Sequence, residues 1–95
     1  MPPPHLLVHH PDDNVGVVVV EGMTAGTEML GVVTHDNSDF RLVAKADVPI
    51  GHKVALKALK AGDTVIKYGE DIGRMVADAE RGGHVHVQNL KTKRW

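Results

Sequence analysis

The sequence predicts a mainly β fold with one or two short helices. The apolar residues are rich in valine, and the stretch 15–21 is typical of a strand buried on both faces. Ten glycines and five prolines, with aromatic residues at only 3%, suit short strands joined by tight turns. A chain of 95 residues has the length of one domain, 1–95.

The predicted strands follow from local patterns. A first short strand is expected at 6–9, followed by a turn at 11–14, where proline and Asx residues favour one. Apolar segments at 29–34 and 40–44 flank the polar turn 36–39. This arrangement predicts a hairpin with a short connection.

Helix and irregular structure are expected in only a few places. Apolar residues recur along one face of 71–80 before a glycine pair, which predicts a short helix, and 54–59 is expected to include one further helical turn. The proline-rich leader 1–5 is predicted to be extended, because proline resists both helix and sheet. Residues 90–95 are read as a basic tail.

One short motif occurs four times. In each copy an apolar residue is followed by a glycine three positions later and by another apolar residue three positions after that. The fourth copy has a second glycine directly after the first. The copies begin at Met23, Val48, Leu59 and Ala79. Glycine permits the positive φ of a tight turn, and the closing apolar residue opens the next strand. The intervals are too irregular for a solenoid, so the motif predicts a small β structure folded back on itself.

Composition argues against several functions. The formal net charge is −1, without the concentrated basic face that nucleic-acid binding needs. There is no cysteine, which excludes disulfide and thiol chemistry. The longest apolar run is too short to span a bilayer, and the N-terminus does not resemble a secretory signal. We therefore expect a cytoplasmic protein with no nucleic-acid or membrane partner.

His84 and His86 alternate with valines, the pattern of a strand with both imidazoles on one face. Their backbone positions would be about 7 Å apart at the usual strand rise. Two such imidazoles can converge on one metal ion or one anionic substrate. The alternative is a solvent-facing strand edge that happens to carry histidine.

Two further polar groups adjoin turn glycines. His52 and Lys53 follow Gly51, which places a proton carrier beside a cation able to hold a carboxylate or sulfonate; the alternative is an ordinary polar turn. Tyr68, beside Lys67, would in isolation be a hairpin corner. The other histidines lie near turns or in the leader and are assigned no role: His5, His9, His10 and His35.

Three ordered segments carry a family resemblance: 51–56, 65–73 and 83–89, with 13–16 fitting the same pattern. Together they resemble the N-terminal or small-subunit domain of the altronate and galactarate dehydratases and of sulfolactate sulfo-lyase. The resemblance implies a SAF-type β-clip fold. It also implies catalytic roles for His84, His86 and His52, metal binding by His84 and His86, and substrate contacts from Lys53, Tyr68, Gln88 and Asn89.

The resemblance further implies a small lyase subunit that is active only with a large catalytic subunit. It would help to β-eliminate sulfite from 3-sulfolactate, an anionic hydroxy acid, to give pyruvate. Iron(II) or a similar divalent ion would be held mainly by the large subunit. The alternatives are the small subunit of a sugar-acid dehydratase, a stand-alone carbohydrate- or acid-binding module, and a purely structural subunit. The valine-rich strand would also favour self-association of the isolated chain.

One position departs from the family pattern. Relatives commonly carry a third alternating histidine where this chain has Gln88. A glutamine side chain can donate or accept a hydrogen bond but cannot carry a proton near neutral pH. Gln88 is therefore expected to be a substrate contact rather than an acid or base.

Overall fold

The computed structural model describes residues 3–92, and within this range the protein forms nine strands and no helix. The strands are β1 (Leu6–Val8), β2 (Val15–Val18), β3 (Glu28–Val33), β4 (Ser38–Val43), β5 (Lys53–Ala55), β6 (Thr64–Lys67), β7 (Glu70–Met75), β8 (His84–Val85) and β9 (Leu90–Lys91). The described part therefore offers no helix that could cross a membrane. The predicted leader and basic tail fall partly on residues 1–2 and 93–95, which lie outside the described residues.

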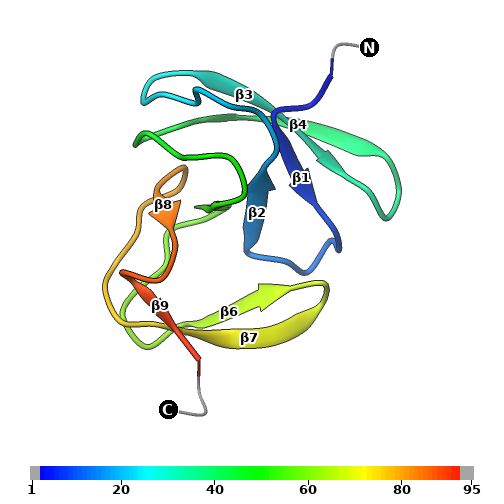
Figure 1. Ribbon diagram of the computed structural model, residues 1–95. Coiled ribbons are helices and arrows are strands. Elements are labelled where there is room, and N and C mark those ends of the chain that lie inside the picture. Colours follow the sequence, from blue (N-terminus) through cyan, green and yellow to red (C-terminus); the bar gives the residue numbers. More distant parts are fainter. Residues whose placement is uncertain (1–2, 93–95) are drawn as a thin grey trace.

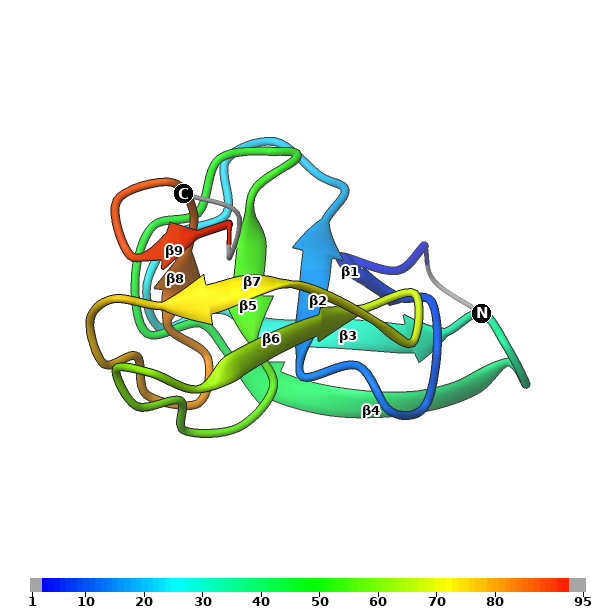
Figure 2. The same ribbon diagram turned by 90° about the horizontal axis from the view of Figure 1, so that it is seen from below.

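Two sheets make up the fold. The larger has the order β4-β3-β1-β2-β5-β8, and the smaller has the order β6-β7-β9. Figure 1 shows the smaller sheet below the larger one, and Figure 2 shows β6 and β7 crossing in front of the paired strands β2 and β5. The mainly β prediction is confirmed, and the architecture fits a small SAF β-clip domain.

The predicted strands and hairpin are confirmed with small shifts in their bounds. The first strand is β1, and the predicted hairpin is β3–β4, whose register pairs Gly31 with Phe40. The strand predicted at 15–21 is shorter, because β2 ends at Val18, although most of its residues are buried as expected.

The predicted helices are wrong. The segment 71–80 contributes most of β7, which pairs with β6 on one side and β9 on the other, and 54–59 contributes part of β5. Met75 lies in the strand, whereas Ala79 forms an isolated bridge with Leu59. Their four-residue spacing thus comes from two separate elements and not from one helical face. Cross-strand pairing outweighs a weak helical pattern here, as tertiary context commonly does.

The four-fold motif is confirmed as four equivalent turns. Their glycines all have positive φ: 90° at Gly26, 86° at Gly51, 96° at Gly62 and 86° at Gly82. In each turn the residue after the glycine donates its N–H to the carbonyl three positions earlier. The glycine N–H donates to the carbonyl of a buried residue, whose own N–H donates back to the carbonyl of the residue after the glycine. The buried residues are Ala44, Val18, Met75 and Ala55, in the same order.

The turns belong to a structural unit that the chain uses twice. Met23 bridges Val48 in the first copy, and Leu59 bridges Ala79 in the second. In each copy, the aspartate before the second bridge residue (Val48 or Ala79) caps the glycine turn that follows the first bridge residue. Asp47 Oδ1 accepts the N–H of Ala25 at 2.9 Å, and Asp78 Oδ1 accepts that of Ala61 at 2.8 Å. Each unit contains a hairpin, β3–β4 or β6–β7, and has a buried core of its own.

Asp13 and Asn14 join the second hairpin to the loop before β2. The buried Asp13 carboxylate accepts the N–H groups of Tyr68 at 3.0 Å and Gly69 at 2.8 Å. The Asn14 amide bonds both Ile66 N and Thr64 O, so it acts as a strand partner for β6. This structural role accounts for the part that 13–16 plays in the sequence pattern.

We expect Asp13→Ala to lower the free energy of unfolding by about 2 kcal/mol, because it removes the charged acceptor of the Tyr68 and Gly69 N–H groups. Urea denaturation of the chain measures the change. Asp39→Ala is the matched control, because Asp39 is an exposed strand residue. Equal midpoints for the two variants would contradict a role for Asp13 in holding the hairpin.

Candidate histidine site

Pairing of β5 with β8 creates the candidate site. Lys53 pairs with Val85, and Val54 pairs with His84. His52 lies at the end of the turn that opens β5, while His84 begins β8 and His86 follows it. Two equivalent turns therefore deliver histidines from positions 32 apart in the sequence to one place. We call His52, His84 and His86 the histidine cluster.

The three rings of the histidine cluster are nearly parallel. The centroids of His52 and His86 are 3.5 Å apart, and those of His52 and His84 are 5.1 Å apart, with interplanar angles of 13° in both pairs. His52 Nδ1 and His84 Nε2 are joined by a hydrogen bond of 2.8 Å. His52 is thus the central member, stacked on one neighbour and hydrogen-bonded to the other.

Gln88 and Asn89 support the cluster from the segment after β8. The Gln88 amide nitrogen lies 3.1 Å from His84 Nδ1. Asn89 is buried; its Oδ1 accepts the N–H of His86 and its Nδ2 donates to the carbonyl of His84. The side chain predicted as a substrate contact at position 89 therefore has its polar atoms committed to the backbone that carries the histidines.

Lys53 supplies positive charge beside the cluster. Burial lowers the pKa of its ammonium group, and the nearby Lys67 lowers it further. Burial also lowers the pKa of His84 and of His86, and the neighbouring His52 adds to both shifts. The neutral imidazole is therefore favoured at His84 and His86, while the partly buried Lys53 cation has lost some of its solvation, which a bound anion would compensate.

We expect the free energy of unfolding to fall as the pH is lowered below about 6.5, the ordinary pKa of histidine. Because the pKa values of His84 and His86 are lowered by folding, the unfolded chain binds protons in that range that the folded chain does not. Urea denaturation between about pH 7.5 and 5.5 measures the slope. His86→Gln should reduce this slope, and a slope that His86→Gln leaves unchanged would contradict the explanation.

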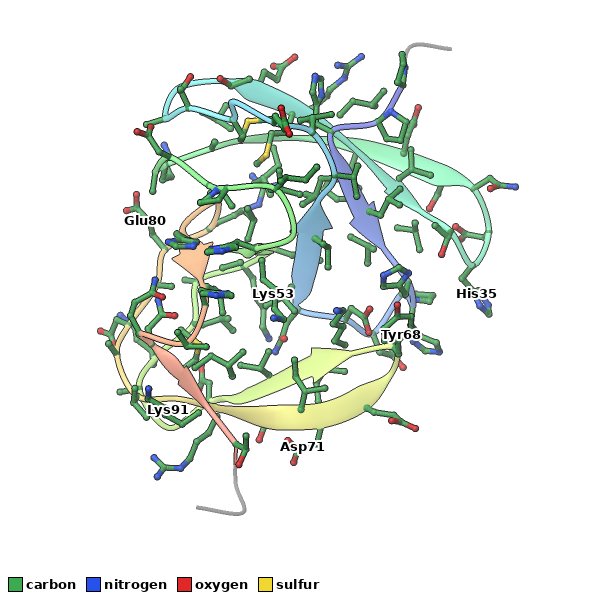
Figure 3. All side chains as sticks on the ribbon, viewed as in Figure 1. His35, Lys53, Tyr68, Asp71, Glu80 and Lys91 are labelled. Atoms are coloured by element: carbon green, nitrogen blue, oxygen red, sulfur yellow. The ribbon has the colours of Figure 1, made fainter. Side chains whose placement is uncertain are left out.

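Tyr68 lies in a different group from the histidine cluster. Its ring stacks on His9 with centroids 4.0 Å apart and an interplanar angle of 10°, and Lys67 Nζ lies 5.3 Å from the ring centroid. Figure 3 shows Tyr68 near His35 at one side of the molecule and Lys53 nearer the middle. Tyr68 was expected to share a site with the histidines, whereas the fold places it at the β6–β7 turn.

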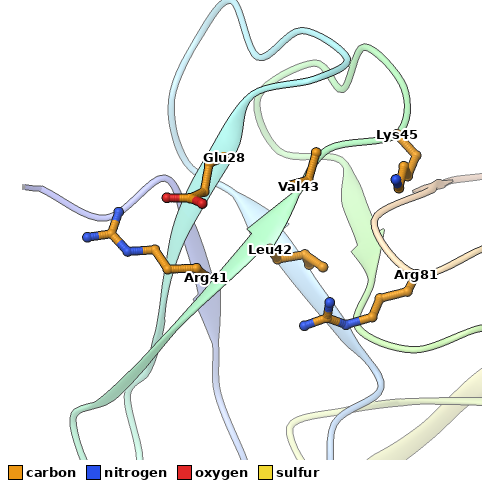
Figure 4. A pocket seen from close by; sticks show the side chains of 6 residues that line it. All are labelled: Glu28, Arg41, Leu42, Val43, Lys45 and Arg81. Carbon is orange, nitrogen blue, oxygen red and sulfur yellow. The ribbon is translucent and has the colours of Figure 1, made fainter.

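A basic pocket lies on another part of the surface. It is a cavity of about 340 Å³ at the end of the β3–β4 hairpin, and Figure 4 shows Lys45 and Arg81 on one side of it. The Arg81 guanidinium donates through Nε to the carbonyl of Leu56. No histidine lines this pocket, so it is not part of the candidate site.

The histidine cluster does not form a complete metal centre. Among residues 3–92, no group of three or more His, Cys, Asp or Glu side chains is arranged to hold a metal ion. Both ring nitrogens of His84 already have hydrogen-bond partners, so this residue would have to lose one to become a ligand. His86 Nδ1 is buried without a partner in the described structure. The residues present do not fit a metal site within this chain.

The described geometry agrees with what comparison with known proteins shows. A profile of the altronate/galactarate dehydratase SAF domain family matches residues 4–93. The chain belongs to this family. The match spans both structural units and every member of the histidine cluster, so the cluster lies within the SAF domain itself.

Individual SAF relatives are of two sizes. The chain is 84% identical over 67 residues, 70% of its length, to the whole of the (2R)-sulfolactate sulfo-lyase subunit alpha of Paracoccus pantotrophus. It is 51% identical to the subunit alpha of Chromohalobacter salexigens, covering 94% of this chain and 95% of that one. It is also 42% identical over 87% of its length to altronate dehydratase of Escherichia coli, of which it spans only 15%. The relatives are thus small lyase subunits or parts of much longer dehydratases.

Proposed function

We propose that this chain is the alpha subunit of a (2R)-sulfolactate sulfo-lyase, which eliminates sulfite from 3-sulfolactate to give pyruvate. The observation that carries the proposal is the histidine cluster beside a partly buried lysine cation. Imidazoles that can exchange or share protons, next to a cation that favours anions, suit a substrate with both a carboxylate and a sulfonate. Two relatives named as subunit alpha support the choice of substrate.

The reaction needs a proton to leave carbon 2 and the carbon–sulfur bond at carbon 3 to break. The bonding electrons of the C–H bond form the new double bond, and those of the C–S bond leave with sulfite. The resulting enol gains a proton at carbon 3 and loses its hydroxyl proton to the solvent, which gives pyruvate. Lys53 and His52 bind the anionic groups, and His86 supports proton movement. Charge that develops as sulfite departs is stabilised by preorganised donors of this kind.

A larger partner subunit completes the cleft in this proposal. Support comes from the contrast in size between the alpha subunits, which this chain matches nearly end to end, and altronate dehydratase, of which it spans a small part. Val87 follows His86 and is 65% exposed, which provides an apolar contact beside the cluster. We place the divalent ion on the partner, assign the complex to the cytoplasm, and expect the chain to be inactive by itself.

Reconstitution tests the proposal. The chain is mixed with its partner subunit and sulfite release from (2R)-sulfolactate is measured, with each subunit assayed separately as a control. We expect release only from the mixture. Activity of the partner at full rate without this chain would overturn the proposed catalytic role.

A sugar-acid dehydratase is the second candidate, because the chain matches altronate dehydratase over most of its length. The same reconstituted complex is therefore assayed with altronate. Dehydration of altronate without sulfite release from sulfolactate would select this alternative and retain the lyase role.

A further inference from the structure

The hydrogen bonds of the cluster have a direction that starts at Gln88. Its amide nitrogen carries only hydrogens, so across the 3.1 Å contact it donates and His84 Nδ1 accepts. A neutral imidazole that accepts at Nδ1 has its proton on Nε2. His84 Nε2 therefore donates to its partner at 2.8 Å, which is His52 Nδ1.

The same reasoning gives the tautomer of His52. Because His52 Nδ1 accepts from His84, the neutral His52 ring carries its proton on Nε2. Every bond in the series Gln88–His84–His52 then points the same way. An exposed glutamine at one end determines which nitrogen bears the hydrogen at the other end.

We propose that Gln88 is a positioning residue that fixes the tautomers of His84 and His52, so that His52 presents an Nε2–H donor to an anionic oxygen of the substrate. This deepens the proposed function and rests on it for the identity of the anion. A neutral imidazole with this tautomer acts as a hydrogen-bond donor and not as a base, so proton removal from carbon 2 falls to another group. Gln88 therefore acts through His84 and His52 and not as the direct substrate contact that the sequence suggested.

Substitutions at Gln88 separate this role from simple packing. Gln88→Glu places an acceptor against His84 Nδ1, so the neutral rings should reverse their bonds: His84 protonated on Nδ1, and His52 donating from Nδ1 with a bare Nε2. Gln88→Met removes the hydrogen bond at similar size and should leave both rings as mixtures of tautomers. Gln88 is exposed, so both variants keep the fold.

Nuclear magnetic resonance of the chain labelled with ¹⁵N-histidine reads the tautomers directly at about pH 8, above the ordinary pKa of histidine. We expect Nε2–H for His84 and His52 in the natural chain, reversal in Gln88→Glu and mixtures in Gln88→Met. In the reconstituted complex, Gln88→Glu should lower kcat/KM by at least about 10-fold. Nδ1–H on His84 of the natural chain, or tautomers indifferent to both substitutions, would overturn the proposal. Failure of the sulfo-lyase assignment would instead appear as missing sulfite release with the tautomers as expected.

Discussion

His52→Ala should reduce sulfite release by the reconstituted complex by about 100-fold or more, the usual effect of losing one preorganised donor to a developing anion. His52 is the central ring of the cluster, stacked at 3.5 Å on His86 and hydrogen-bonded at 2.8 Å to His84. Its removal therefore takes away a donor and loosens both neighbours. Steady-state kinetics on purified complex, normalised to assembled complex, measures the effect.

Two comparisons make the result specific. His52→Asn retains an N–H donor near the same place and should recover about 10-fold of the lost rate. His35→Ala removes an exposed imidazole at the β3–β4 turn and should leave turnover unchanged. A loss of less than about 3-fold in His52→Ala, with assembly intact, would remove the cluster from the catalytic site.

Gly82→Ala should destabilise the chain by about 3 to 4 kcal/mol, which for a domain of this size lowers Tm by about 15 °C or more. Gly82 has a φ of 86°, and an added Cβ would lie 2.2 Å from the carbonyl oxygen of Val43. That oxygen belongs to the backbone and cannot rotate away. The turn would have to move, and with it the bonds that Gly82 makes to Ala55 and Lys45.

Gly62→Ala is the matched control for this prediction. Gly62 lies in the first turn of the same structural unit, and Gly82 lies in the second. Its φ is 96°, but an added Cβ would meet nothing within 4 Å. It should lose only the 1 to 2 kcal/mol or so that left-handed backbone costs an L residue. Thermal and urea unfolding of the two variants therefore separate backbone strain from collision, and equal losses would show that the contact with Val43 is unimportant.

Features of the fold that depend on local chemistry were predictable from the sequence. The four turns follow from glycines that need positive φ, and the β3–β4 hairpin follows from a polar turn between apolar segments. The prediction of a helix at 71–80 was wrong because Met75 and Ala79 have the spacing of a helical face but belong to separate elements. Their true partners lie in other strands and turns, which local spacing cannot reveal.

The candidate site was predictable in part. Strand alternation singled out His84 and His86, and the turn glycine singled out His52 with Lys53. The hydrogen bond between His52 and His84 depends on the pairing of β5 with β8, which joins segments far apart in the chain. Gln88 and Asn89 are adjacent in sequence but have different roles. The buried Asn89 amide hydrogen-bonds the backbone, whereas the Gln88 amide hydrogen-bonds the His84 ring, and local sequence does not distinguish the two.

The repeated unit has a consequence for how such a site can originate. Gly51-His52-Lys53 and Gly82-Gly83-His84 occupy equivalent places after the closing turns of the two copies, so His52 corresponds to Gly83 and Lys53 to His84. Where β5 meets β8, Lys53 pairs with Val85 and Val54 pairs with His84, so each residue faces the neighbour of its counterpart and not the counterpart itself. The asymmetric arrangement of imidazole and ammonium groups reflects differences at three corresponding positions, His52/Gly83, Lys53/His84 and Ala55/His86. The candidate site of this small protein thus lies where two copies of one structural unit meet and differ in sequence.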